Sequence, residues 1–195
     1  MKNMLLATAL ASALFAIPAA HAANDSGFFL NAQVGQAALD RNGYDGDDTG
    51  YALNGGYRWA LAPNFLLGVE GGYTHLGSFD PKGAIPAIGS AELKGWTVGA
   101  NAHFNMTDNW YLSGRAGYFR SDLKGGYVTS FDPATNVYGV SHIDDTSSKW
   151  YAGVGFGYDF NNNFSIGLNY DYYKADKNGL DLNPRLVSVS GEYRF

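Results

Sequence analysis

The sequence predicts an all-β protein that forms an eight-stranded, antiparallel, transmembrane up-and-down β-barrel. Three observations lead to this prediction. Apolar and polar residues alternate with a period of two in eight segments, and side chains alternate between the two faces of a strand. The connections between these segments are short and long in turn. Aromatic residues gather at both ends of the apolar faces, where a membrane barrel meets its two interfaces.

Residues 1–22 are expected to be a cleaved signal peptide outside this fold. A positive head at Lys2 precedes an apolar run at 5–17 and the small-x-small cleavage motif AHA at 20–22. The run has about 13 residues, fewer than the roughly 20 that a spanning helix needs. Residues 23–195 are therefore expected to be one outer-membrane barrel domain.

The composition excludes several classes of protein. The chain has no cysteine, which excludes a disulfide-stapled exported scaffold. Its net charge is -5 and it has no basic stripe, so we expect no nucleic-acid binding. Glycine (26 residues) and aromatic residues (15%) are both abundant. Because disordered chains are poor in aromatic residues, this composition favours a folded chain with many strands. No cofactor is expected.

The first four predicted strands place glycine, asparagine or a charge opposite an apolar series. These series are Phe28-Leu30-Ala32-Val34 in 27–36, Tyr51-Leu53-Tyr57-Trp59 in 51–59, Phe65-Leu67-Val69-Tyr73 in 65–74 and Trp96-Val98-Ala100-Ala102-Phe104 in 95–104. About ten residues in a tilted strand cross the hydrocarbon layer.

The next three predicted strands repeat the scheme. Their apolar series are Trp110-Leu112-Ala116-Tyr118 in 110–119, Trp150-Ala152-Val154-Phe156-Tyr158-Phe160 in 150–160 and Phe164-Ile166-Leu168-Tyr170-Tyr172 in 164–173. The polar faces are rich in Gly, Ser and Asn, which suits the narrow interior of an eight-stranded barrel.

The last predicted strand, 185–195, is well patterned although chain ends usually fray. Its apolar or glycine face is Val187, Val189, Gly191, Tyr193 and Phe195. Lipid offers no partner for an open strand edge, so this strand is expected to pair with the first one and close the barrel.

The connections place both chain ends on the same side. The segments 60–64, 105–109 and 161–163 are short turns, whereas 37–50, 75–94, 120–149 and 174–184 are long and polar. The connection 120–149 has more apolar residues than a solvated loop requires. We interpret it either as a ligand-binding loop or as strands that continue above the membrane.

The alternative fold is a soluble barrel or sandwich with its apolar face inward. The aromatic residues argue against it, because a soluble core has no reason to hold Tyr and Trp at both rims. The predicted girdle comprises Trp59, Trp96, Trp110, Trp150, Tyr51, Tyr73, Tyr118 and Tyr172.

Several stretches resemble the transmembrane domain family of outer membrane protein A. They are VEGGYTHLGS, LKGWTVGANAHFNMTDNWYLSGRAGYFRSDLK, WYAGVGFGYDF, IGLNYDYYKAD and LVSVSGEYRF. The most specific is 93–124; the others are shared with small barrels of the opacity-antigen and adhesion-and-invasion types. The resemblance implies a bacterial outer-membrane location. It also implies that 187–195 act as a signal for the barrel-assembly machinery. The peptidoglycan-binding domain of longer members is not expected in a chain that stops at Phe195.

The resemblance also implies a charged cluster that blocks or gates a narrow lumen. Glu70 matches its acidic member, but Asn101, Gly157 and Gly167 stand where other members are expected. Arg115 and Asp171 point inward near the depth of Glu70, and a buried charge without a partner is costly. We therefore predict a Glu70–Arg115 pair, with trapped water around isolated groups as the alternative. The groups expected to hydrogen-bond around this pair are Asp171, Asn101, Asn54 and Asn169.

No enzyme activity is expected. His75 with Ser78, and the group Ser141, His142, Asp144 and Asp145, are the nearest to a catalytic set. Loop neighbours do not guarantee the geometry of a nucleophile and its base. The histidines lack a metal-ligand spacing, so no metal is expected.

Three functions remain open. We favour a structural role in envelope integrity, with a narrow pore for small solutes as the second hypothesis. The third is an adhesin or surface antigen that binds an extracellular ligand through 120–149. The expected partners are outer-membrane lipid, lipopolysaccharide and the assembly machinery, and the protein is expected to be a monomer.

Overall fold

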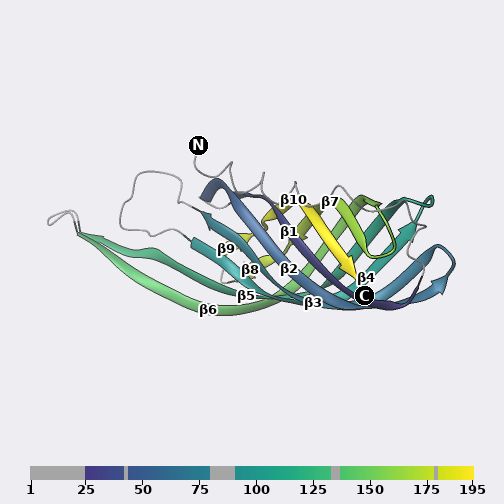
Figure 1. Ribbon diagram of the computed structural model, residues 1–195. Coiled ribbons are helices and arrows are strands. Elements are labelled where there is room, and N and C mark those ends of the chain that lie inside the picture. The colour runs from purple at the N-terminus through teal and green to yellow at the C-terminus, as the bar shows by residue number, and fades with distance from the viewer. Residues whose placement is uncertain (1–24, 42–43, 80–90, 133–136, 178–179) are drawn as a thin grey trace.

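The computed structural model describes residues 25–41, 44–79, 91–132, 137–177 and 180–195. A closed barrel forms in the order β1-β10-β7-β6-β5-β4-β3-β2, and β8 and β9 form a separate two-stranded sheet (Figure 1). The strands are β1 Gly27–Arg41, β2 Tyr44–Ala62, β3 Phe65–Phe79, β4 Ala91–Asn105, β5 Trp110–Asp132, β6 Val137–Asp159, β7 Phe164–Tyr173, β8 Ala175–Lys177, β9 Leu180–Leu182 and β10 Arg185–Arg194. The predicted signal peptide lies outside the described residues.

The seam between the first and last barrel strands closes the wall. β1 and β10 are antiparallel, with Leu30 opposite Tyr193 and Val34 opposite Val189. The amide of Phe195 donates to the carbonyl of Phe28 at 3.0 Å. Every neighbouring pair in the barrel is antiparallel, which confirms the predicted fold class.

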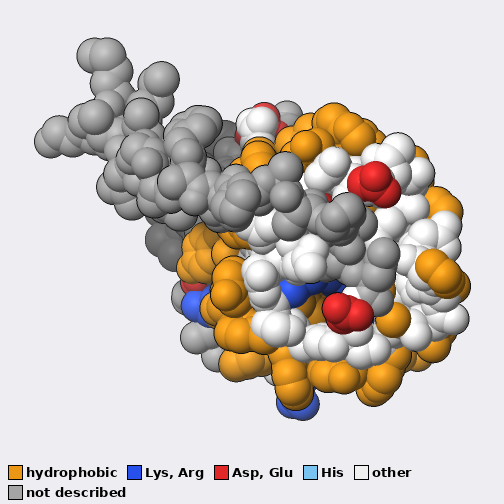
Figure 2. Space-filling view, turned by 45° about the vertical axis from the view of Figure 1, so that its right-hand side comes forward, with side chains coloured by type: hydrophobic (Ala, Val, Ile, Leu, Met, Phe, Trp, Pro, Cys, Tyr) orange, Lys and Arg blue, Asp and Glu red, His pale blue; other side chains and the backbone are white. Residues whose placement is uncertain are grey.

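The outer face of the barrel is apolar. β10 alternates exposed and buried positions along its length, and its exposed positions include Val187, Val189 and Tyr193. Hydrophobic side chains surround the wall in Figure 2, and Lys or Arg atoms show in the hollowed centre. The apolar face therefore points outward, which excludes the soluble alternative. Within the described ranges, no helix is long and apolar enough to cross a membrane.

The strands extend further toward the long connections than the sequence predicted. β5 and β6 have 23 residues each, and their pairing continues to Asp132 opposite Val137. Within 120–149, which was predicted as a connection, residues 120–132 and 137–149 are strand, and 133–136 lie outside the described residues. The hairpin projects well beyond its neighbours (Figure 1). This backbone agrees with the second interpretation of 120–149, in which the strands continue above the membrane.

Candidate functional site in the barrel interior

Arg115 forms the central ion pair of the interior, and its partner is Asp171. In the strand register, Arg115 on β5 faces Gly153 on β6, and Gly153 faces Asp171 on β7. Arg115 Nη2 lies 2.6 Å from Asp171 Oδ2, and Arg115 Nε donates to Asp171 Oδ1 at 2.7 Å. A Cβ at Gly153 would overlap with the Asp171 carboxylate. Because Gly153 has no side chain, Arg115 can reach across β6 to Asp171 on β7.

The predicted Glu70–Arg115 pair is wrong. Glu70 accepts hydrogen bonds from Asn101 Nδ2 at 2.8 Å and from the Tyr151 hydroxyl at 2.7 Å. Gly99 and Gly117 lie between Glu70 and Tyr151 in the register of β3 to β6. Because neither glycine has a side chain, the tyrosine ring can extend over two strands and occupy one side of the glutamate.

The six residues of the predicted network all lie inside the barrel, but they form separate contacts. Asn54 accepts a hydrogen bond from Thr97 Oγ1 at 3.3 Å. Asn169 Nδ2 donates to Ser190 Oγ at 2.8 Å. Neither asparagine bonds Glu70, Arg115 or Asp171, so the expected single cluster is resolved into smaller groups.

A second ion-pair cluster, which the sequence analysis missed, lies nearer the short turns. Arg58 Nη2 donates to Glu192 Oε2 at 2.9 Å, and Arg194 Nε donates to Glu192 Oε1 at 3.0 Å. Arg194 also pairs with Asp159. These four residues are buried. All four stand on the polar faces of predicted strands, so the same alternation could have located them.

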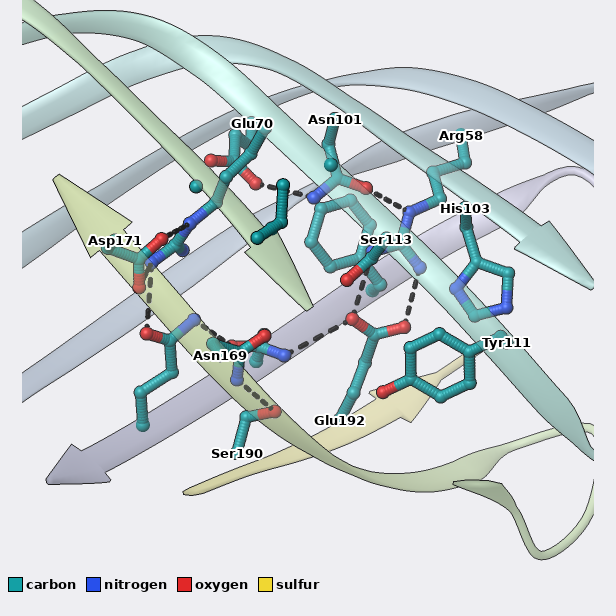
Figure 3. Close-up of a pocket in the computed structure, with 17 residues that line it drawn as sticks. Arg58, Glu70, Asn101, His103, Tyr111, Ser113, Asn169, Asp171, Ser190 and Glu192 are labelled. Atoms are coloured by element: carbon teal, nitrogen blue, oxygen red, sulfur yellow. Dashed lines mark hydrogen bonds and ion pairs between the residues drawn. The ribbon is translucent and has the colours of Figure 1, made fainter. Parts of the chain in front are cut away.

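Asn101 joins the second cluster to Glu70. Its Oδ1 accepts from Arg58 Nε, and its Nδ2 donates to Glu70 (Figure 3). Asn31 and Gln33 link the second cluster to the Arg115–Asp171 pair. Asn31 Nδ2 donates to Glu192, Gln33 Nε2 donates to Asn31 Oδ1 at 3.0 Å, and Gln33 Oε1 accepts from Arg115. These contacts connect the two ion-pair groups and Glu70, whereas the Asn54–Thr97 and Asn169–Ser190 hydrogen bonds stand apart from them.

Little space remains within this network. The cavity among its side chains is about 20 Å³, close to the space of one water molecule. A larger cavity of about 290 Å³ lies at the short-turn end, beside Arg58, Asn162, Arg194 and Phe195. The described interior thus contains a hollow at one mouth and a nearly filled centre.

The predicted girdle residues lie on the outer face. Six are exposed, and Tyr73 and Tyr172 are half-buried because they pack against Trp96 and Trp150 at centroid distances of 5.2 and 5.3 Å. Among the residues of the predicted assembly signal, Phe195 is the most exposed at 73%. Gly191 lies on the same outward face as Phe195. Their roles stay predictions.

The catalytic candidates do not form a nucleophile–base pair in the described region. His75 Nε2 lies 3.2 Å from Glu92 Oε1, and its Nδ1 accepts from the amide of Gly77 at 3.2 Å. Both ring nitrogens are thereby engaged away from the Ser78 hydroxyl. The side chains of 141–145 lie outside the described residues.

Two carboxylates beyond the membrane-spanning segments carry shifted pKa values. The amides of Ser78 and Thr49 donate to the Asp48 carboxylate and lower its pKa. The ammonium of Lys94 lies 2.9 Å from Glu92 and lowers the pKa of that carboxyl group. These contacts tie the outer ends of β2, β3 and β4 together.

Comparison with known proteins identifies the family. The outer membrane protein beta-barrel domain matches residues 7–195. The chain belongs to this family. It is accordingly a protein of the bacterial outer membrane, and its interior network is that of a small outer-membrane barrel.

Individual relatives agree with this assignment. Outer membrane protein A of Escherichia coli O157:H7 is 27% identical over 202 residues, which cover 100% of this chain and 55% of the relative. The chain therefore spans about half the length of that relative. The attachment invasion locus protein Ail of Yersinia pestis has a TM-score of 0.57 at 20% identity, covering 87% of this chain and 97% of Ail. Neisserial surface protein A has a TM-score of 0.54 at 14% identity, covering 87% and 99%.

Proposed function

We propose that the protein has a structural role in the outer membrane, in which a closed barrel supports envelope integrity and carries its long hairpin outside. The observation that supports this role best is the filled interior, with a central cavity of about 20 Å³. A narrow pore, the second hypothesis, would need the Arg58–Glu192 and Arg115–Asp171 pairs to separate first. Breaking a buried pair leaves uncompensated charge, which is expensive.

The test is deletion of the gene in its own host. We expect the deletion strain to release more outer-membrane vesicles and to become more sensitive to detergent. The wild-type gene and a variant lacking residues 126–141, the outer part of the hairpin, should both restore the envelope. An intact envelope in the deletion strain would contradict the structural role. If only the wild-type gene restored the envelope, the function would depend on the hairpin.

Ligand binding by the β5–β6 hairpin is the second candidate function. β6 pairs with β7 from Tyr151 onward, whereas its pairing with β5 continues outward to Asp132 opposite Val137, so the hairpin offers a long two-stranded surface. Ail has been solved in complex with the heparin analogue sucrose octasulfate. We would therefore use this compound as the first probe, and titrate it against the wild type and the hairpin-shortened variant. Equal binding by both proteins would exclude the hairpin as the site.

Lipid and lipopolysaccharide are the proposed partners of the outer wall. Lys94, Arg120, Lys174 and Arg185 stand on the outward face just beyond the outer aromatic residues, where lipid phosphates lie. Native mass spectrometry of the protein released from outer membranes should detect bound lipopolysaccharide and a monomer. Replacing all four residues by Gln should reduce the lipopolysaccharide retained.

The strand that closes the barrel is also the proposed signal for the assembly machinery. Val187, Val189, Tyr193 and Phe195 are exposed on one face and available before the seam forms. Phe195→Ser should slow assembly in cells more than it reduces the stability of the refolded protein. An equal loss in both measurements would indicate a purely structural residue.

A further inference from the structure

The half of the lumen toward the long connections is filled by apolar side chains rather than ion pairs. Seven buried residues from seven barrel strands form one cluster there, with exposed fractions of 0–1%. We call this cluster the apolar ring. It comprises Ala37 on β1, Leu76 on β3, Leu93 on β4, Phe119 on β5, Tyr151 on β6, Tyr173 on β7 and Leu186 on β10.

The remaining barrel strand, β2, contributes the glycine that lets the ring close. Gly50 is buried, and a Cβ built there would come within 2.7 Å of Leu186 Cδ1 and 3.3 Å of Ala37 Cβ. The space that a side chain on β2 would fill is therefore taken by its neighbours. Each of the eight strands supplies one position to the layer.

Aromatic contacts fix the centre of the ring. Tyr173 meets Phe119 edge to face at a centroid distance of 5.1 Å and stacks on Tyr151 at 5.8 Å. The Tyr151 hydroxyl points toward the polar network, where it donates to Glu70. The ring is thus anchored to the ion-pair region beneath it.

We infer that the apolar ring is the main barrier to ions crossing this barrel. Water reaches almost no surface of its members, and dewetted apolar constrictions exclude ions. An ion in this layer would lose its hydration and meet no charged side chain of the ring, and the neutral hydroxyl groups of the buried Thr74, Thr97 and Ser121 could replace only part of that hydration. Removing an ion pair from the network below should therefore leave the lumen closed. This inference deepens the proposed structural role, because it names the part of the barrel that keeps the membrane sealed.

Single-channel conductance of the refolded protein in a planar bilayer tests the inference. The first variant, Arg115→Ala/Asp171→Ala, removes the central pair while it keeps the interior charge-balanced. The second adds Leu76→Thr and Leu93→Thr, which bring hydroxyl groups into the ring with residues that favour strands. The control adds Leu67→Thr and Leu112→Thr instead, the same change on the lipid-facing side. A heat-dependent gel shift confirms that each variant is folded.

We expect the wild type, the pair-less variant and the control to stay within about twofold of the bare membrane, and the ring variant to conduct at least about tenfold more. If the pair-less variant conducted while the wild type stayed silent, the inference would be overturned, but the proposed closed barrel would stand. A folded ring variant that stays silent would also overturn it. A conducting wild type would instead contradict the proposed closed barrel. If the ring variant does not insert, Phe119→Ser in the pair-less background replaces it, with the same expected and contrary results.

Discussion

The two halves of the lumen follow the same alternation but are filled by opposite chemistry. Toward the short turns, inward positions carry Arg58, Asp159, Glu192 and Arg194, which form buried ion pairs. Toward the long connections, the corresponding positions form the apolar ring. Phe29, Leu66 and Tyr111 are also buried near the short turns, but among charges, with the Arg58 guanidinium carbon 3.9 Å from the centre of the Phe29 ring.

This difference shows that the two halves depend on different physical terms. In the polar half, each charge is stabilised by a specific partner, so removal of one member exposes another to an environment that cannot solvate it. In the apolar half, removal of a side chain leaves a cavity and lost contacts. Substitutions in the two halves should therefore differ both in size and in how they respond to a second, compensating change.

The largest effect is expected from Arg58→Ala. Glu192 would lose its bidentate partner, and Asn101 would lose a donor. The expected loss is about 3–5 kcal/mol in the free energy of unfolding. Urea unfolding from lipid vesicles, followed by tryptophan fluorescence, measures it. Arg58→Ala leaves two carboxylates with one arginine in the cluster, whereas Arg58→Ala/Glu192→Ala leaves the balanced Arg194–Asp159 pair and should recover part of the loss.

The matched control is Arg120→Ala, since this arginine is exposed on the outer face of β5. Its loss should remain within about 0.5 kcal/mol. If Arg58→Ala behaved like this control, the ion pair would not be important for stability.

Leu93→Ala should produce the next largest effect. Leu93 is only 1% exposed in the apolar ring, and truncation of a fully buried leucine costs about 2–5 kcal/mol. Leu112→Ala, on the outer face at 44% exposure, should cost less, because lipid chains fill the space that it leaves. The same unfolding experiment compares both. Equal losses would mean that the ring does not behave as a packed core.

Gly153→Ala should have a moderate effect. Its new Cβ would overlap with Asp171, so Arg115 and Asp171 would have to move apart. Overpacking of this kind costs about 1–3 kcal/mol. Gly114→Ala is the control, because a Cβ there has no atom within 4 Å. A neutral Gly153→Ala would show that the pair has room to adjust, and would weaken the argument that glycines set the pairing.

Alternation predicted the strands, and the alternating connection lengths and the two aromatic belts predicted the barrel and its outward apolar face. Lipid on one side and a narrow interior on the other impose a period of two on every strand, so Leu67 and Glu70 could be assigned to opposite faces without a structure. The pairing of charges could not be assigned in this way. Which inward residues meet depends on register and on the glycines between them, as Gly153 and Gly99 show.

The apolar ring could not be predicted for the same reason, because alternation does not show which inward residues meet. Ala37, Leu76 and Leu93 lie in segments predicted as connections, because glycine and polar neighbours interrupt the pattern there. Phe119, Tyr151 and Tyr173 stand at inward positions of predicted strands, but nothing local shows that they meet. A cluster of this kind is produced by closure of the wall, so it requires all eight strands at once.

The smallest effect is expected from acid at the outer ends of the strands, beyond both halves of the lumen. Amide donors from Ser78 and Thr49 lower the pKa of Asp48 from its usual value of 3.8. A lowered pKa means that this stabilisation is complete above pH 3.8, the unfolded value, and is lost as the pH falls through the folded pKa. The loss should be below about 1 kcal/mol, because the group is only partly buried and solvent screens its interactions. NMR measurement of amide hydrogen exchange at Ser78 between neutral and acid pH should show weaker protection in acid, after correction for the pH dependence of the intrinsic exchange rate. His75, Glu92 and Lys94 lie nearby, so Asp48→Asn is the control: in this variant the protection of the Ser78 amide, corrected for the intrinsic exchange rate, should not change between neutral and acid pH. The same loss of protection in Asp48→Asn would assign it to Glu92, the other carboxylate with a lowered pKa in this group.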